Sequence, residues 1–83
     1  AQVLQEPSAQ TPEGTGININ CSHPSIQGDM NVQWYRHLPD QAPHHIVTGV
    51  TGDKPVRDPP GRLWVSADRR SSALWLARPR RGD

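Results

Sequence analysis

The sequence predicts an all-β fold, a sandwich of two sheets without a helix of any length. Apolar and polar residues alternate in several short runs, which is the pattern of half-buried strands. Seven glycines and nine prolines fall between these runs at turn positions. A cysteine on one run and a tryptophan on the next, Cys21 and Trp34, both point inward, as in the central pin of a sandwich.

The first half of the chain holds three predicted strands. They cover residues 2–5, 15–22 and 32–37. The first ends before a proline, which lacks a backbone donor and is tolerated at a sheet edge. In the second, Asn18 and Asn20 face outward because side chains alternate along a strand. In the third, Trp34 points inward, whereas Tyr35 and His37 point outward.

The second half holds three more predicted strands, joined by turns. They cover residues 44–49, 62–66 and 73–77. The segment 49–60 is predicted to be irregular, because glycine, aspartate and proline are poor strand formers. Leu74 and Leu76 are expected in the core and Trp75 on the surface. A charged turn at 68–72 joins the last two strands.

Composition excludes several classes of function. Eighty-three residues allow one domain, and a net charge of +1 is too small to indicate nucleic-acid binding. No apolar run approaches the roughly 20 residues of a membrane span. Residues 1–7 lack the apolar core of a signal peptide, so the chain is expected to start like a processed secretory domain.

Catalytic and metal sites are also not expected. The sequence contains no nucleophile motif and no glycine-rich loop that opens a helix, so we expect no enzyme and no cofactor. Four histidines raise the question of a metal site: His23, His37, His44 and His45. The adjacent pair His44-His45 would point to opposite faces of a strand, so it cannot readily hold one ion.

The predicted core is thin. Hydrophobic residues make up 33% of the chain, and Cys21 is the single cysteine. A sandwich of this size usually depends on a disulfide, which one cysteine cannot form within the chain. These 83 residues alone are therefore expected not to form a stable monomer.

Four sequence features together resemble a V-type immunoglobulin domain. They are the spacing of Cys21 and Trp34, the run Trp34-Tyr35-Arg36 followed by Pro39 and Pro43, the segment Arg62-Leu63-Trp64-Val65-Ser66-Ala67-Asp68, and Leu74-Trp75-Leu76 followed by Gly82-Asp83. Within that family, Cys21-Ser22-His23 and the hairpin 66–72 look most like an avian T-cell receptor alpha chain variable region. His37 departs from the family, which usually has glutamine there.

The resemblance implies a single partial domain over residues 1–83, with strands A to E, C′ and C″ and without strands F and G. It implies that Cys21 is half of an inter-sheet disulfide whose partner lies beyond this sequence. Trp34, Leu74 and Leu76 would form the core. Arg62 and Asp83 would form a salt bridge at the base of the sandwich.

The resemblance also implies recognition surfaces. The first hypervariable loop would comprise Ser25, Ile26, Gln27, Gly28, Asp29, Met30 and Asn31. The second would comprise Gly49, Val50, Thr51, Gly52 and Asp53. These loops would contact a peptide bound to an MHC or MHC-like molecule. A beta-type variable domain would pair with the face formed by Tyr35, His37, Pro43 and His45. The domain would lie on the extracellular face of the plasma membrane, anchored through segments downstream of residue 83.

Other functions remain open at this point. One alternative is the V-type domain of another cell-surface receptor or adhesion protein. Another is an integrin ligand that acts through Arg81-Gly82-Asp83, although the resemblance gives Asp83 a structural role. Asn20-Cys21-Ser22 also matches the acceptor motif for N-linked glycosylation, with Asn20 on the outward face of its strand.

Overall fold

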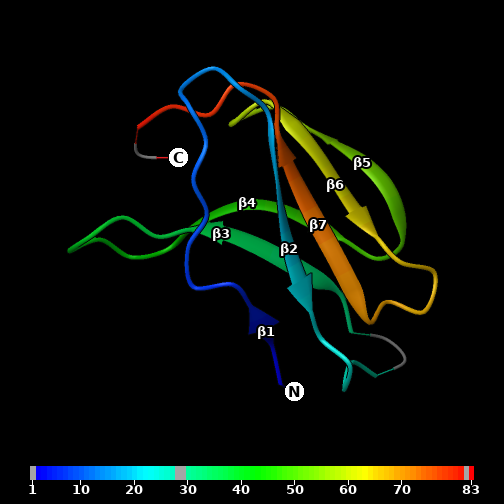
Figure 1. Ribbon diagram of the computed structural model, residues 1–83. Helices are drawn as coiled ribbons and strands as arrows, with labels where there is room; N and C mark the ends of the chain where they lie inside the picture. The colour runs from blue at the N-terminus through cyan, green and yellow to red at the C-terminus, as the bar shows by residue number, and fades with distance from the viewer. Residues whose placement is uncertain (1, 28–29, 82) are drawn as a thin grey trace.

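Seven β-strands form two sheets in the computed structural model, which describes residues 2–27, 30–81 and 83 (Figure 1). The strands are β1 Leu4–Gln5, β2 Ile17–Ser22, β3 Val32–Arg36, β4 His44–Gly49, β5 Gly52–Val56, β6 Gly61–Val65 and β7 Ser71–Leu76. The larger sheet has the antiparallel order β1-β2-β7-β6-β5, and β3 and β4 form a separate hairpin. Within the described residues, no helix is long and apolar enough to cross a membrane. The predicted all-β sandwich is confirmed.

The core lies between the larger sheet and the β3–β4 hairpin. Leu63, Val65 and Leu74 have exposures of 0%, 1% and 3%, and Trp34 packs with them from the hairpin. Every second residue of β6 and β7 is buried because strand side chains alternate between the two faces. The predicted inward positions of Trp34, Leu74 and Leu76 are confirmed.

The segment predicted to be irregular contains a strand. β5 pairs along its whole length with β6, from Gly52 opposite Val65 to Val56 opposite Gly61. It lies at the edge of the larger sheet, where Pro55 does not need to donate a ladder hydrogen bond. Local propensity alone therefore gave the wrong prediction, because an available sheet edge outweighs weak strand-forming residues.

The β3–β4 hairpin contains an irregularity in its register. Trp34 lies opposite Val47, but the next residue, Tyr35, lies opposite His45, so Ile46 is the extra residue. A bulge of this kind increases the local twist and turns side chains toward new directions. Here it places the rings of Tyr35 and His45 together on the outer face of the hairpin.

Candidate functional site

Three turns meet at one end of the sandwich. The strand ends that carry them are neighbours in the sheets, with Ser22 opposite Ser71 and Val32 opposite Gly49. The first turn is the predicted loop 1 after β2, the second joins β4 to β5, and the third joins β6 to β7 (Figure 1). This end therefore presents a continuous surface built from both sheets.

Loop 1 is anchored at its apolar residue and exposed elsewhere. Ile26 is half-buried and packs against the core, and its amide donates to the carbonyl of His23 at 3.2 Å. Ser25, Gln27, Met30 and Asn31 are exposed. Gly28 and Asp29, which were also predicted to belong to this loop, lie outside the described residues. The described part presents three polar side chains and the apolar side chain of Met30 on a fixed base, which suits both hydrogen bonding and apolar contact with a partner.

Arg69, in the β6–β7 turn, reaches the backbone of loop 1. Its guanidinium donates to the carbonyl of Met30 at 2.6 Å and to that of Gln27 at 3.5 Å. Arg69 has a φ of 61°, a left-handed conformation that few residues other than glycine, asparagine and aspartate adopt. Nothing in the sequence pattern pointed to this role, because the contact spans 39 positions along the chain.

Asp68 holds the same turn in shape. Its Oδ1 accepts a hydrogen bond from the Ser66 hydroxyl at 2.6 Å and another from the Arg70 amide at 3.0 Å. Both bonds favour the ionised carboxylate, and the Ser66 bond has the larger effect in lowering the pKa of Asp68. The turn that supports Arg69 is therefore itself stabilised by a charged side chain.

The predicted loop 2 is shorter than expected. Gly49 ends β4 and Gly52 and Asp53 begin β5, so only Val50 and Thr51 connect the strands. Gly52 has a φ of 78°, which a side chain would disfavour. A Cβ at Gly49 would lie 2.6 Å from a methyl carbon of the buried core residue Leu63. The two glycines thus allow the chain to pass tightly from one sheet to the other.

Lys54 fastens the start of β5 to the hairpin. Its ammonium donates to the backbone carbonyl of Thr48, near the end of β4, at 2.7 Å. Val50 projects from the connection with 56% of its surface exposed. The second turn therefore exposes the apolar side chain of Val50, and the backbone on either side of it is held to both sheets.

A buried polar cluster lies beneath loop 1. The hydroxyl of Ser72, on β7, lies 3.3 Å from the indole nitrogen of Trp34 and 3.1 Å from Nε2 of His23. Ser72 is 2% exposed and His23 is 5% exposed. Among the described residues, His23 Nδ1 has no hydrogen-bond partner. The cluster connects the two sheets beside the predicted core residue Trp34.

The predicted chain-pairing face is partly assembled in the structure. Tyr35 is 50% exposed, and its ring meets that of His45 edge-on at a centroid distance of 5.5 Å. Tyr35 also donates a hydrogen bond to the side-chain carbonyl of Gln33, two residues away on the same face. His37 and Pro43 are exposed beyond the strand ends. The result is an exposed aromatic surface with polar neighbours.

The predicted salt bridge between Arg62 and Asp83 is wrong. Asp83 Oδ1 instead lies 3.5 Å from the guanidinium of Arg36, at the end of β3. Arg62 faces solvent because it alternates with the buried Leu63 on β6. The Asp83 side chain is only 7% exposed, and its other oxygen accepts from the Arg80 amide at 3.0 Å.

The same contacts bear on the tripeptide Arg81-Gly82-Asp83. The Asp83 carboxylate is turned toward Arg36, although Asp83 as a whole residue and Arg81 are both exposed. Gly82 lies outside the described residues. The structural role of Asp83 is supported, although with a partner different from the one expected.

Cys21 and Asn20 occupy neighbouring positions on β2 with opposite orientations. Cys21 is partly buried beside the core, and burial raises the pKa of its thiol. Asn20 is exposed on the outer face of the larger sheet. The proposed disulfide of Cys21 requires a partner outside this sequence and remains a prediction.

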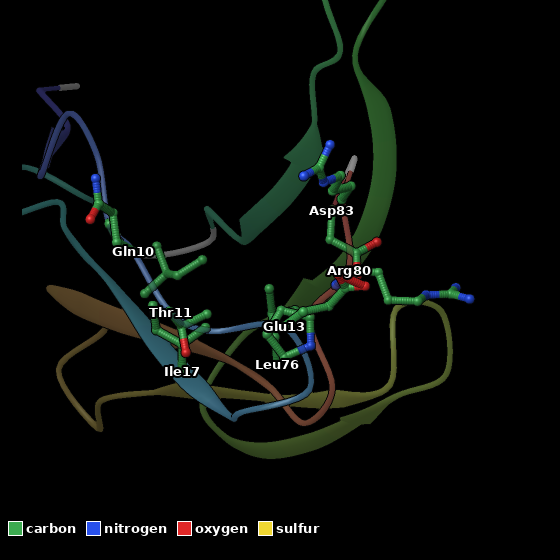
Figure 2. Close-up of a pocket in the computed structure, with 11 residues that line it drawn as sticks. Gln10, Thr11, Glu13, Ile17, Leu76, Arg80 and Asp83 are labelled. Carbon is green, nitrogen blue, oxygen red and sulfur yellow. The ribbon is translucent and has the colours of Figure 1, made fainter.

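Hollows open along the side of the sandwich. One of them, of about 560 Å³, lies between the N-terminal segment, β2 and the C-terminal residues. Figure 2 shows Gln10 and Thr11 on one side of it and Arg80 and Asp83 on the other. Among the described residues, no group of three or more histidine, cysteine, aspartate or glutamate side chains is placed to hold a metal ion.

Comparison with known proteins identifies relatives over nearly the whole chain. The chain is 33% identical over 76 residues to human T cell receptor alpha variable 26-1, and this match covers 92% of the chain and 68% of that protein. It is 34% identical over 82 residues to human T cell receptor alpha variable 2, covering 99% of the chain and 68% of that protein. No family model matches the chain.

A solved structure agrees with these relatives. A crystal structure of a chicken T-cell receptor superimposes with a TM-score of 0.91 and is 68% identical in sequence. The superposition covers 99% of this chain and 42% of that receptor chain. The expectation of a V-type immunoglobulin sandwich is confirmed by this match, and the avian resemblance agrees with it.

Proposed function

The chain belongs to the T-cell receptor alpha variable family, and from that premise we propose that it pairs with a beta-type variable domain and binds a peptide presented by an MHC molecule. Domains of this family are extracellular parts of membrane receptors and are not enzymes. The alternative of an unrelated adhesion domain is therefore set aside. The fold supplies the rigid support, and the loops at one end supply the variable contacts.

The pairing proposal depends mainly on the outer face of the β3–β4 hairpin. Tyr35 and His45 form an exposed aromatic pair there, flanked by the amide of Gln33. Aromatic residues with a polar tip are typical anchors at protein interfaces, because they bury a large area and still satisfy a hydrogen bond. We infer that Tyr35 lies near the centre of the interface and that His37 and Pro43 border it.

The recognition proposal depends on the end of the sandwich where the three turns meet. Loop 1 offers exposed polar side chains, and the β4–β5 turn offers Val50. Arg69 restrains loop 1 from the β6–β7 turn. Restraint of a binding loop before contact lowers the entropy that is lost on binding. The presented peptide and the presenting molecule would meet this surface.

Pairing can be tested on the complete variable domain co-expressed with a beta-type variable domain. We expect Tyr35→Ala to weaken association by roughly tenfold or more, because central aromatic anchors commonly contribute about 2 kcal/mol or more. His37→Ala is expected to weaken it less. Trp64→Ala is the matched control, since Trp64 is similarly exposed at 47% but lies on the opposite sheet. Association that is undiminished in Tyr35→Ala would exclude this face as the pairing surface.

A further inference from the structure

The outer face of the larger sheet carries two exposed tryptophans that the proposed function does not use. Trp64 on β6 is 47% exposed, and Trp75 on β7 is 41% exposed. Trp75 lies opposite Arg62, and Trp64 follows two residues later on the same face, so the two backbone positions are diagonal neighbours, whereas the Trp75 indole extends over Gly16 on the β2 side. The exposed indole of Trp64 is an apolar surface that is available to a ligand or to a covalently attached group.

Asn20 stands in the same row of the sheet as Trp64. Asn20 lies opposite Ala73 on β7, and Ala73 lies opposite Trp64 on β6. The three residues thus span two inter-strand spacings, or about 10 Å. Ala73 has the smallest side chain of the three, so the row is low between the amide and the indole (β2, β7 and β6 in Figure 1).

Asn20 also begins the single glycosylation acceptor motif of this sequence, Asn20-Cys21-Ser22. We propose that Asn20 carries an N-linked oligosaccharide whose first sugars cross Ala73 and cover Trp64. The sugar chain is long enough to span the row, and its attachment keeps it at high local concentration over the indole.

The chemical character of the surface fits a sugar. A pyranose ring offers one face of C–H groups, which pack on an indole, and hydroxyls around its rim. The rim would meet Asn18 on β2, Arg62 on β6 and Asp53 on β5, which all lie on the same outer face. These side chains are an amide, a cation and an anion, and they offer both hydrogen-bond donors and acceptors. Such a surface suits a neutral, hydroxyl-rich ligand better than a purely apolar one.

The attachment is a group transfer in the secretory pathway. The donor is an oligosaccharide linked through pyrophosphate to a membrane lipid. The side-chain nitrogen of Asn20 bonds to C1 of the first sugar as the bond from C1 to the phosphate oxygen breaks. The lipid pyrophosphate leaves, and the amide nitrogen gives up one proton to a base of the transferase. Because β2 is paired on both sides in the fold, transfer must precede sheet formation.

Occupancy is tested by expressing the complete receptor chain in vertebrate cells and analysing the peptide that contains Asn20 by mass spectrometry. Release of the sugar with a glycoamidase should convert Asn20 to aspartate in the wild type. The conversion should be lost in Ser22→Ala, which leaves Asn20 intact, and retained in Ser22→Thr and in the matched control Asn18→Gln. An unmodified Asn20 in the wild-type chain would overturn the proposal.

Coverage is tested by hydroxyl-radical footprinting of the same folded proteins, with oxidation measured at each tryptophan. Removal of the sugar, by Asn20→Gln or by enzymatic release from the folded chain, should raise oxidation of Trp64 severalfold. The buried Trp34 serves as the internal control and should not change. If Trp64 is equally reactive with and without the sugar, the sugar does not cover it. Protection that persists without the sugar would show that another molecule occupies this face, which would also overturn the proposal.

Discussion

Replacement of Ser72 by alanine should destabilise the domain far more than loss of one hydroxyl normally does. The Ser72 oxygen serves two buried groups at once, the indole N–H of Trp34 and Nε2 of His23. Its removal leaves both without this partner at a site where Ser72 is 2% exposed. Each buried polar group left unsatisfied costs about 1–3 kcal/mol, so the loss of a partner by two such groups is expected to cost about 2–6 kcal/mol. Since His23 Nδ1 already lacks a partner among the described residues, the ring would be especially poorly satisfied.

The assay is thermal and urea unfolding of the complete variable domain paired with a beta-type domain in one chain. Even the smallest expected loss, about 2 kcal/mol, should lower the melting temperature by about 8–16 °C in a domain of about 100 residues. Ser71→Ala is the control, because this neighbouring serine donates its hydrogen bond to Ser66 from the backbone amide, which the substitution keeps. The free energy of unfolding should change by no more than about 0.5 kcal/mol. Equal melting temperatures for the two variants would refute the assignment of Ser72 as a shared partner.

The turn contacts and the thin core lead to three more expectations. Arg69→Lys keeps the charge but loses the planar guanidinium with its paired donors. Hydrogen exchange of the Met30 amide in loop 1, measured by NMR, should therefore become faster, while the melting temperature changes little. Unchanged exchange would contradict the restraint of loop 1 by Arg69. The pKa of Asp68, measured by NMR titration, should lie below its usual value and should rise in Ser66→Ala. Because the pKa is lowered in the folded state, Asp68 stabilises the turn above the usual carboxyl pKa. This stabilisation is lost as the pH falls through the lowered value. The 83-residue chain on its own should show no cooperative urea transition. Alkylation of its Cys21 at about pH 8, near the usual thiol pKa, should be as fast as in an unfolded peptide. Slow alkylation together with a sharp transition would show that the chain folds alone.

Side-chain alternation predicts most of the fold. The inward positions on β6 and β7 and the orientations of Trp34 and Tyr35 were all predictable, because one face of each strand is apolar. β5 was not predictable in this way. Its sequence is unfavourable for a strand, and only the free edge of β6 makes it one.

The site was less predictable than the fold, for a related reason. The predicted loops and aromatic face follow from local pattern and from family resemblance. The contacts of Arg69 with loop 1 and of Ser72 with Trp34 connect residues 38 or more positions apart, and no local pattern encodes them. The wrong prediction of the Asp83 partner has the same origin. Arg62 and Arg36 both lie near strand ends, and only the sheet geometry shows that Arg36 faces inward and Arg62 faces solvent.

The separation of the strands into two sheets has a mechanical consequence for recognition. Loop 1 leaves β2 in the larger sheet and enters β3 in the hairpin, while the short connection at Val50 leaves β4 in the hairpin and enters β5 in the larger sheet. Each loop is thus anchored once in each layer. Any rocking of the hairpin against the larger sheet moves one anchor of both loops together. A partner domain that binds at Tyr35 and His45 would therefore fix the positions of both loops together. Direct contact of the partner with either loop is not needed for this effect.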